Sequence, residues 1–438
     1  MIEVNRNSGR LREIYNKEIL EFMAELYELK EQEERVILVA VSTEDNDDTV
    51  NSVNELSELV ATAGAITVGT VIQNRESVHP GTYVGKGKIE EIREMLWERE
   101  ATGVICDDEL SPAQLRNLED ALQTKVMDRT MVILDIFASR ARTREGKIQV
   151  ELAQLKYRAV RLVGLRNSLS RLGGGIGTRG PGEKKLEIDR RLIHDRISVL
   201  KEELEDVKRH REVQRKQREG SGTLSVAIVG YTNAGKSTLL NTLTQAGILA
   251  EDKLFATLDP TTRALTLPSG EKVLLTDTVG FIRKLPHHLI DAFKSTLEEA
   301  KYSDVILHVV DCSNPQMDMQ MHVVYETLRQ LEVMGKEVVT VFNKIDKENA
   351  DQTCRDPKAD YRVKISAKTG EGLDELLATI EKILRNRRIY LEKIFNYAEA
   401  GKIQKIRKYG QLLSEEYTDE GILVKAYVPA ELFEEFYR

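Results

Sequence analysis

Two short strings of this chain have the residue types and the spacing to bind a nucleotide. Gly230 to Ser237 reads GYTNAGKS, a glycine-rich spacing whose backbone N–H groups can surround phosphates. Lys236 should reach the β- and γ-phosphates, and the Ser237 hydroxyl should bind Mg²⁺. Further along, Asn343-Lys344-Ile345-Asp346 offers a carboxylate at Asp346 that matches the paired N1–H and N2–H₂ donors of guanine, which adenine lacks. Together the two strings predict GTP binding and hydrolysis.

The segment between these strings contains residues expected to act on Mg²⁺ and the γ-phosphate. Asp277-Thr278-Val279-Gly280 resembles the GTPase element in which the aspartate supports the metal and the glycine N–H meets the γ-phosphate. Phe255 to Asp259 lies where the first switch should be. Thr257 is the predicted metal ligand of this switch, and Thr261 and Thr262 are the alternatives.

A tripeptide near the end of this region, Ser366-Ala367-Lys368, is similar to the loop that closes over guanine in such enzymes. The predicted nucleotide-binding residues are Gly230, Tyr231, Thr232, Asn233, Ala234, Gly235, Lys236, Ser237, Phe255, Ala256, Thr257, Leu258, Asp259, Asp277, Thr278, Val279, Gly280, Asn343, Lys344, Ile345, Asp346, Ser366, Ala367 and Lys368. Among them, Lys236, Asn233 and Gly280 are predicted to act in catalysis, and Ser237 and Thr257 to bind Mg²⁺. The predicted cofactors are GTP or GDP and Mg²⁺, with K⁺ as a hypothesis.

Two departures from the Ras pattern bear on hydrolysis. Phe281 stands where Ras-like enzymes place a water-orienting glutamine, and since a phenyl ring cannot orient water, intrinsic hydrolysis should be slow and a partner should complete the site. Asn233 matches the asparagine of GTPases that bind K⁺ beside the phosphates, which suggests K⁺-stimulated hydrolysis. Alternatively, Asn233 only caps a local turn. His287 and His288 are interpreted as surface residues of the second switch, with assistance in catalysis as the alternative.

These residues need a sheet whose strands end at the nucleotide. Short apolar runs predict buried strands, and the run after the phosphate loop predicts a helix whose N-terminus faces the phosphates. The expected strands are 225–229, 273–276, 338–342 and 361–365, and the expected helix is 237–243. Residues 262–267, the turn Pro268-Ser269-Gly270 and the strand at 273–276 are typical of a hairpin.

An earlier run of alternating elements predicts a separate parallel α/β domain. We expect an amphipathic helix up to Lys30, then strands at 36–41, 65–71, 103–106 and 125–127, and helices at 50–63, 88–98 and 111–122. The glycine-containing string Tyr83 to Lys88 lacks the phosphate-loop spacing. It is interpreted as a turn into a helix and not as a second nucleotide site.

Apolar residues then repeat at alternating steps of three and four in two stretches, 143–170 and 183–218. This predicts a seam between two long antiparallel helices, each ~40 Å in length. The tip between them, Gly173 to Glu183, has six glycines in eleven residues. A backbone with few side chains lets a polyanion approach while Arg and Lys meet its phosphates. The predicted RNA contacts are Gly174, Gly175, Arg179, Gly180, Lys184 and Lys185. The alternative is a simple hairpin loop.

The net charge of −8 is unevenly distributed. Residues 138–220 contain 22 Lys and Arg against 12 Asp and Glu, a local charge of +10, so the remainder carries −18. Such asymmetry indicates one region that meets a polyanion. Three scattered cysteines predict a reducing cytoplasm, and the polar N-terminus lacks a signal-like apolar run. No apolar run reaches the ~18 residues of a membrane span, although peripheral association with a membrane stays open.

The expected fold class is α/β with several domains. An N-terminal parallel α/β domain (1–141) precedes a basic two-helix arm (142–220), a Ras-like P-loop GTPase domain (221–385) and a small C-terminal α/β domain (386–438). In the last of these, a helix is expected at 400–411 and a strand at 422–428.

The tip GGGIGTRGPGE, the preceding QVELAQLKYRAVRL and the strings LFATLDPTTR and DTVGFI resemble HflX-type translational GTPases, from about Val36 through the GTPase domain. The resemblance implies binding to the large ribosomal subunit and the 70S ribosome through ribosomal RNA, with the arm directed toward the peptidyl-transferase region. It also implies GTP-dependent separation of stalled or idle ribosomes and ribosome-stimulated hydrolysis. The chain is expected to act as a monomer. Two alternatives stay open: a large-subunit assembly factor, and an RNA-remodelling protein with a regulatory GTPase domain and an ATP-using N-terminal domain.

Overall fold

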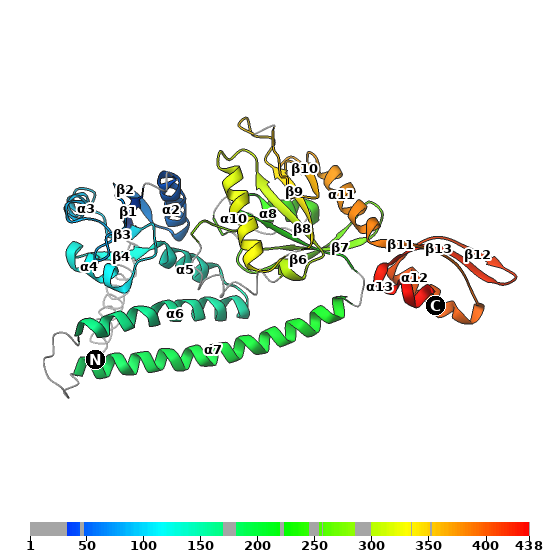
Figure 1. Ribbon diagram of the computed structural model, residues 1–438, viewed down its shortest axis with the longest axis horizontal. Helices are drawn as coiled ribbons and strands as arrows, with labels where there is room; N and C mark the ends of the chain where they lie inside the picture. Colours follow the sequence, from blue (N-terminus) through cyan, green and yellow to red (C-terminus); the bar gives the residue numbers. More distant parts are fainter. Residues whose placement is uncertain are drawn as a thin grey trace, which may run out of the picture.

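The computed structural model describes residues 33–43, 48–169, 181–219, 223–244, 254–255, 257–284, 299–333, 335–350 and 353–437. Figure 1 shows the N-terminal domain and the P-loop domain side by side along a two-helix arm, with the small C-terminal domain beyond the P-loop domain. The predicted multidomain α/β class is confirmed. The predicted helix up to Lys30, the histidines His287 and His288, and the tip residues 173–180 lie outside the described residues.

The N-terminal domain is a four-stranded parallel sheet of order β2-β1-β3-β4 with helices on both faces. Its elements are β1 (Arg35–Ser42), α2 (Thr49–Ala63), β2 (Ile66–Asn74), α3 (Lys86–Glu98), β3 (Gly103–Cys106), α4 (Pro112–Leu122), β4 (Lys125–Asp128) and α5 (Arg129–Arg140). Side chains of β1 alternate between the two faces: Val36 and Leu38 pack with α2 and α5, whereas Ile37 and Val39 pack with α3 and α4. The sheet is therefore buried on both sides.

All these elements were predicted except α5. Its buried residues surround most of the helix and include Ile133, Leu134, Ile136 and Phe137, so no polar face reveals a helical period. The turn predicted at Tyr83 to Lys88 does lead into α3, which begins at Lys86.

The arm consists of α6 (Arg144–Leu169) and α7 (Pro181–Glu219). The predicted apolar seam is present, with Ile148 and Leu152 of α6 packed against Ile197 and Leu200 of α7. The expected length of ~40 Å holds for α6, but the 39 residues of α7 make a helix of about 58 Å. Tyr157 of α6 donates a hydrogen bond to Asp128 Oδ1 at 2.5 Å, so the arm is anchored to the N-terminal domain.

The P-loop domain has a six-stranded sheet of order β10-β9-β8-β5-β7-β6, in which only the β6–β7 pair is antiparallel. Its elements are β5 (Ser225–Gly230), α8 (Lys236–Thr244), β6 (Thr261–Thr266), β7 (Lys272–Asp277), β8 (Val305–Asp311), α10 (Met317–Gln330), β9 (Glu337–Asn343), β10 (Tyr361–Lys364) and α11 (Leu373–Asn386). The predicted strands, helix and β6–β7 hairpin are confirmed. The carboxyl ends of β5, β7 and β9 meet at one edge, which places their following loops together.

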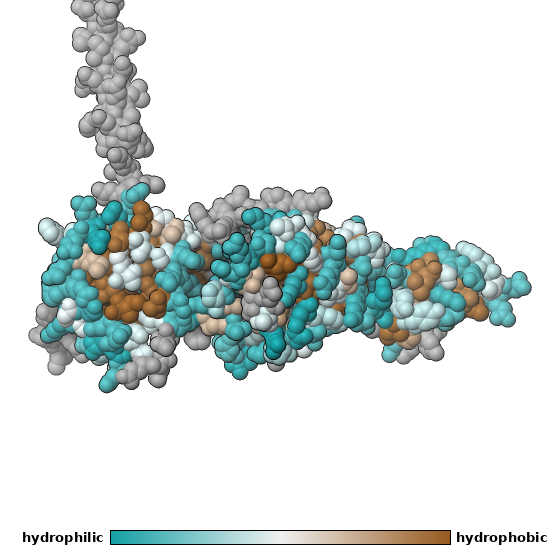
Figure 2. Space-filling view, turned by 90° about the horizontal axis from the view of Figure 1, so that it is seen from above, coloured by the Kyte–Doolittle hydropathy of each residue, from teal (hydrophilic) through white to brown (hydrophobic). Residues whose placement is uncertain are grey.

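The C-terminal domain is a three-stranded antiparallel sheet of order β11-β13-β12 packed against helices. Its elements are β11 (Arg388–Phe395), η1 (Tyr397–Glu399), α12 (Ala400–Tyr409), β12 (Gln411–Thr418), β13 (Gly421–Pro429) and α13 (Ala430–Tyr437). The predicted helix and strand correspond to α12 and β13, whereas β11, β12 and α13 were not predicted. Hydrophilic residues cover most of the described surface of the P-loop and C-terminal domains in the view of Figure 2, while apolar residues gather on the N-terminal domain. Within the described ranges, no helix has both the length and the apolar composition for crossing a membrane.

Candidate active site

The phosphate loop connects β5 to α8 and bends around a buried lysine. Lys236 Nζ donates to the backbone oxygens of Gly230, at 3.2 Å, and Tyr231, at 2.8 Å. Burial lowers the pKa of Lys236 to about 8. At Gly235 the backbone is left-handed (φ 96°), and a Cβ there would lie 2.3 Å from Asn343 Nδ2, so this position requires glycine. The loop thus holds a cation among carbonyl oxygens that phosphate oxygens can replace.

Three oxygen-bearing side chains meet next to this lysine. Ser237 Oγ lies 2.8 Å from Thr257 Oγ1 and donates to Asp277 Oδ2 at 2.7 Å. The other carboxylate oxygen, Asp277 Oδ1, is buried without a hydrogen-bond partner, and burial raises the pKa of this carboxyl. Hydroxyl and carboxylate oxygens are the donors that Mg²⁺ prefers, and an unpartnered buried oxygen fits a metal-bound water. The residues present therefore fit a Mg²⁺ site.

The choice of Thr257 over its neighbours agrees with this geometry. Thr257 reaches the phosphate loop, whereas Thr262 Oγ1 pairs with Thr276 Oγ1 at 2.9 Å across the β6–β7 hairpin. Thr261 opens β6, opposite Asp277 in the strand register. Neither alternative threonine lines the cavity described below.

The guanine string lies at the end of β9 and is joined to the phosphate loop. Asn343 Nδ2 donates to Ala234 O at 2.9 Å, and Asn343 Oδ1 accepts from Ala367 N at 2.9 Å. Lys344 Nζ donates to Asn233 O at 2.8 Å. These bonds fix the phosphate end of the site relative to the base end.

The carboxylate that should read the base is exposed and oriented. Ser366 Oγ donates to Asp346 Oδ1 at 2.6 Å, and this hydrogen bond lowers the pKa of Asp346. Asp346 is therefore ionised at neutral pH and can accept two hydrogen bonds from guanine.

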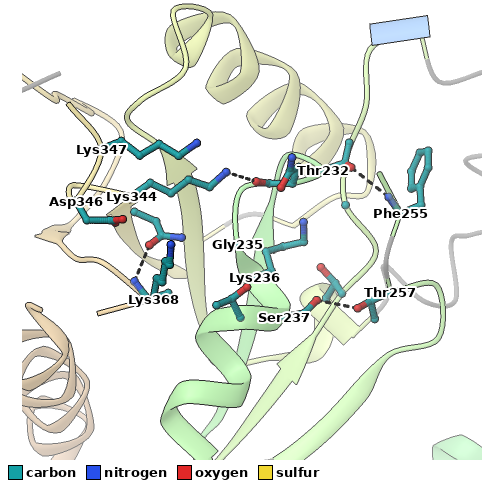
Figure 3. A pocket seen from close by; sticks show the side chains of 16 residues that line it. Thr232, Gly235, Lys236, Ser237, Phe255, Thr257, Lys344, Asp346, Lys347 and Lys368 are labelled. Carbon is teal, nitrogen blue, oxygen red and sulfur yellow. Dashed lines mark hydrogen bonds between the residues drawn. The ribbon is translucent and has the colours of Figure 1, made fainter. Parts of the chain in front are cut away.

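All of these loops border one cavity of about 510 Å³. Figure 3 shows Ser237 and Thr257 on one side of it, and Asp346 and Lys368 on the other. Its lining residues are Thr232, Asn233, Gly235, Lys236, Ser237, Thr238, Phe255, Thr257, Thr278, Gly280, Asn343, Lys344, Asp346, Lys347, Ala367 and Lys368. Its volume suits a nucleotide.

Some predicted site residues support the cavity without lining it. Gly230, Tyr231, Ala234, Asp277, Val279, Ile345 and Ser366 lie behind it, and Ala256 is outside the described residues. Leu258 is buried in the core, and Asp259 points to the arm, as described below. Conversely, Thr238 and Lys347 line the cavity and Asp311 Oδ2 pairs with Lys344 Nζ at 2.7 Å, though none of the three was predicted. Thr238 and Lys347 each follow directly on a predicted motif, so position was their signal, whereas Asp311 ends β8, a strand that was not predicted.

Gly280 and Phe281 differ sharply in their surroundings. A Cβ on Gly280 would lie 2.8 Å from Thr232 Cα and 3.0 Å from Lys236 Nζ, so only glycine leaves room beside the phosphate loop. The Phe281 ring is 2% exposed and belongs to the core. Its backbone is held by Thr232 N, which donates to Phe281 O at 2.8 Å. Phe281 is therefore a packing residue, and its ring does not line the cavity.

Asn233 lies at the mouth of the cavity. It is exposed and has a left-handed backbone (φ 60°), a conformation that asparagine tolerates better than most residues. The geometry agrees with both the turn and the cation interpretation of this residue.

The N-terminal domain contacts both the phosphate loop and the second switch. Tyr231 of the loop donates to Glu55, and its hydroxyl accepts from Arg283 N at 2.9 Å. Lys284 Nζ donates to Asp107 Oδ2 at 2.5 Å and to Asp108 Oδ1 at 2.6 Å.

A buried arginine organises this interface from the other side. Arg129 pairs with Asp107 at 2.8 Å and with Glu55 at 2.6 Å. Burial alone would raise the pKa of Asp107, but Arg129 and Lys284 bring it below its usual value. These long-range contacts had no signal in the sequence.

Three family models match consecutive parts of the chain. They are described as GTP-binding GTPase N-terminal (residues 50–138), GTP-binding GTPase Middle Region (residues 140–218) and 50S ribosome-binding GTPase (residues 225–344). The three matches cover most of the N-terminal domain, the arm and most of the P-loop domain.

Relatives match over most of their length. A GTPase HflX of Lacrimispora saccharolytica is 75% identical over 411 residues, 94% of this chain and 97% of the relative. A GTPase HflX of Escherichia coli is 44% identical over 329 residues, 74% of this chain and 77% of the relative. Among solved structures, that of the SsGBP and GDP complex is 26% identical with a TM-score of 0.45 and covers 80% of this chain and 98% of that one.

Proposed function

Because the chain belongs to the GTPase HflX family, we propose that it binds the large ribosomal subunit and the 70S ribosome and splits or rescues stalled or idle ribosomes in its GTP state. Family membership makes it a GTP-hydrolysing enzyme with a ribosome-binding GTPase domain. The observation that carries the proposal is a guanine-nucleotide cavity on the same chain as a basic two-helix arm. We place the protein in the cytoplasm as a monomer.

The residues of the cavity have separate proposed roles in binding phosphate, metal and base. Lys236 and the backbone N–H of Gly280 face the phosphates, where they favour negative charge as it develops on the γ-phosphoryl oxygens. Ser237 and Thr257 would hold Mg²⁺, with Asp277 behind them. When bound, the metal supplies neutralising charge to the β- and γ-phosphates. Asp346 selects guanine.

Hydrolysis should depend on the ribosome because Phe281 stands at the position of the water-orienting glutamine and cannot orient water. Phe281 is buried in the core and cannot move into the cavity without losing its packing. A group from ribosomal RNA or protein, with K⁺ held at Asn233, would complete the site. GTPase rates should therefore be higher in K⁺ than in Na⁺ at equal ionic strength. Equal rates in the two salts would exclude a role of K⁺ in hydrolysis.

The arm is proposed to contact ribosomal RNA through its tip. Gly174, Gly175, Arg179 and Gly180 lie outside the described residues, while Lys184 and Lys185 lie in the first turns of α7. The long α7 gives these basic residues a rigid support at the far end of the arm (Figure 1). Arg and Lys at such a tip would meet phosphates and make binding depend on salt.

Co-sedimentation tests the proposal. The protein is mixed with 70S ribosomes, large subunits or small subunits, in GDP or a non-hydrolysable GTP analogue. We expect binding to large subunits and 70S ribosomes with the analogue and weaker binding with GDP. In the Asp346→Asn variant, ribosome binding should no longer increase with the GTP analogue, because the variant lacks the charged acceptor for the guanine N–H groups. Absence of the protein from every ribosomal fraction would refute the proposal, and preference for precursor subunits would favour the assembly role.

A charge-matched pair of variants tests the arm. Neutralising Arg179, Lys184 and Lys185 to Gln should weaken ribosome binding and reduce its salt dependence while GDP affinity stays unchanged. The control neutralises Lys201, Lys208 and Arg209, which are equally basic but lie away from the tip on α7. Equal effects of both triple variants would contradict a specific role for the tip.

A further inference from the structure

The side chain of Asp259 joins the first switch to the base of the arm. Its Oδ2 accepts hydrogen bonds from Arg142 N and Thr143 N, both at 2.9 Å, and its Oδ1 accepts from Thr143 Oγ1 at 2.6 Å. Arg142 and Thr143 directly precede α6. A carboxylate of the GTPase domain therefore receives three donors at the N-terminus of the first arm helix, where the helix dipole favours negative charge.

The contact is part of the helix cap. Thr143 Oγ1 also accepts from Gly146 N at 3.0 Å, as an N-cap hydroxyl does, and Thr143 O accepts from Lys147 N at 3.1 Å. Asp259 thus bonds to the residue that caps α6. A displacement of Asp259 would disturb the point where the arm begins.

The fit around this carboxylate is tight. A Cβ on Gly146 would lie 2.3 Å from Asp259 Oδ1 and 3.2 Å from Thr143 Oγ1. Since three donors hold the carboxylate, it cannot yield to a methyl group without breaking them. Gly146 is unfavourable inside a helix for entropic reasons, so its presence agrees with a need for this close approach.

The same carboxylate lies two residues from the predicted metal ligand. Thr257 contacts Ser237 at 2.8 Å, Leu258 between them is buried, and Pro260 restricts the backbone of Asp259 on the other side. β6 then begins at Thr261. The short strip from Thr257 to Thr261 is consequently fixed at both ends and in its middle.

Phe255 holds the strip on its other side. Its ring packs edge-on against Phe137 of α5 at 4.7 Å, and its N–H donates to Thr232 Oγ1 at 3.2 Å. The first switch is thus held to the N-terminal domain at Phe255 and to the arm at Asp259, with Thr257 between the two contacts.

We propose that Asp259 is a positioning residue, which holds Thr257 at the Mg²⁺ site by its bonds to the base of the arm and so couples nucleotide state to the arm. Because coupling between two sites is reciprocal, a force on the arm changes the placement of Thr257, and GTP with Mg²⁺ changes the hold on the arm. The role of the ribosome in this coupling rests on the proposed function; the bonds between switch and arm do not.

The first experiment uses the free full-length protein. Dissociation constants for a non-hydrolysable GTP analogue and for GDP are measured with and without Mg²⁺. We expect Asp259→Asn and Gly146→Ala, which break the contact from opposite sides, each to lower the Mg²⁺-dependent preference for the analogue over GDP by about tenfold. Thr143→Ser keeps the hydroxyl donor and should retain the wild-type preference. Glu326→Gln on α10, which neutralises a partly exposed acid paired with Arg329, is the charge-matched control.

Thermal unfolding separates positioning from a merely structural cap. A lower melting temperature with an unchanged preference for the GTP analogue in both variants would overturn the proposal. A loss of preference in Asp259→Asn and Gly146→Ala, but not in Thr143→Ser or Glu326→Gln, would support it.

The second experiment adds ribosomes. We expect Asp259→Asn to lower the kcat of ribosome-stimulated hydrolysis by about tenfold with little change in KM for GTP, because Thr257 acts on the bound nucleotide. If wild-type protein does not bind ribosomes, but the variants lose analogue preference, the proposed function fails and the coupling stands. If ribosome binding is normal and the variants keep both preference and kcat, the coupling fails and the proposed function stands.

Discussion

At the scale of single residues, burial changes the pKa of charged side chains in the site. Lys236 is enclosed by backbone carbonyls, so its ammonium loses water and its pKa falls to about 8. Bound phosphates would restore the preference for the charged form. Nucleotide binding should therefore be accompanied by proton uptake when Lys236 is partly deprotonated.

This predicts a specific pH profile for GDP affinity. Below the pKa of about 8 Lys236 is already protonated and the affinity should be flat; above it the affinity should fall, approaching a tenfold loss per pH unit. Fluorescence titration with a labelled GDP from about pH 6.5 to pH 9 measures it. In the Lys236→Arg variant, the side chain stays charged throughout this pH range, and any ionisation of the guanine base affects both proteins equally. The affinity profiles of wild type and variant should therefore separate above the pKa of Lys236. Parallel profiles would contradict the shifted pKa.

Sequence alone predicted the residues whose chemistry lies in a local string. Lys236 and Asp346 stand in motifs whose spacing carries their function, and the contact of Thr257 with Ser237 agrees with the prediction of Thr257 over Thr261 and Thr262. Asp259 was predicted as a nucleotide-site residue, but its partners Arg142 and Thr143 lie more than a hundred positions earlier. No local pattern encodes such a pair, because each side has an ordinary role in its own segment.

At the scale of elements, the loop after β7 contains Phe281, which packs in the core and does not take part in the reaction. Phe281 joins a core shared with helices of the N-terminal domain. We predict that Phe281→Ala lowers the free energy of unfolding by about 3 kcal/mol, since a large cavity would remain. Denaturant unfolding measures this, and intrinsic GTP hydrolysis should not increase. Faster hydrolysis with unchanged stability would mean that the ring obstructs a catalytic water instead.

The arm offers a second test at this scale. Leu200 is 1% exposed in the seam between α6 and α7. Leu200→Ala should weaken the seam by about 2 kcal/mol or more and speed hydrogen exchange in both helices. GDP affinity should be unchanged, since Leu200 does not line the cavity. Val199, the exposed neighbour, provides the control Val199→Ala, which should leave exchange as in the wild type. Similar exchange in both variants would contradict the packed seam.

The same elements mark the limits of sequence patterns. Heptad spacing located α6 and α7 because one apolar face repeats, whereas α5 is buried on several sides and has no such contrast. In the C-terminal domain, β11 and β12 were missed, since the exposed faces of both strands carry large apolar residues such as Ile389, Tyr390 and Leu413 that blur the alternation.

At the scale of the whole molecule, the N-terminal domain and the GTPase domain meet through buried charge. Asp107 accepts from Arg129 on its own domain and from Lys284 on the second switch. Asp107→Asn should lower the free energy of unfolding by about 3 kcal/mol, because it leaves a buried guanidinium short of its counter-charge. A double-mutant cycle with Lys284→Met measures how much of the loss crosses the interface. Additive effects would show that the two domains do not couple through this pair.

We propose that the whole molecule works as a nucleotide-controlled arm. The cavity, the first switch and the start of α6 are linked by consecutive contacts, and the arm runs alongside the N-terminal and P-loop domains (Figure 1). In this proposal, GTP acts through the linkage to make the chain separate ribosomal subunits.

Light scattering from 70S ribosomes tests that claim most directly. The protein is added in GDP or in the non-hydrolysable GTP analogue, and the scattering is followed with time. We predict a fall toward the level of separated subunits with the analogue, no fall with GDP, and no fall for the Arg179, Lys184 and Lys185 triple variant in either nucleotide. Identical traces for wild-type protein in GDP and in the analogue would contradict the account.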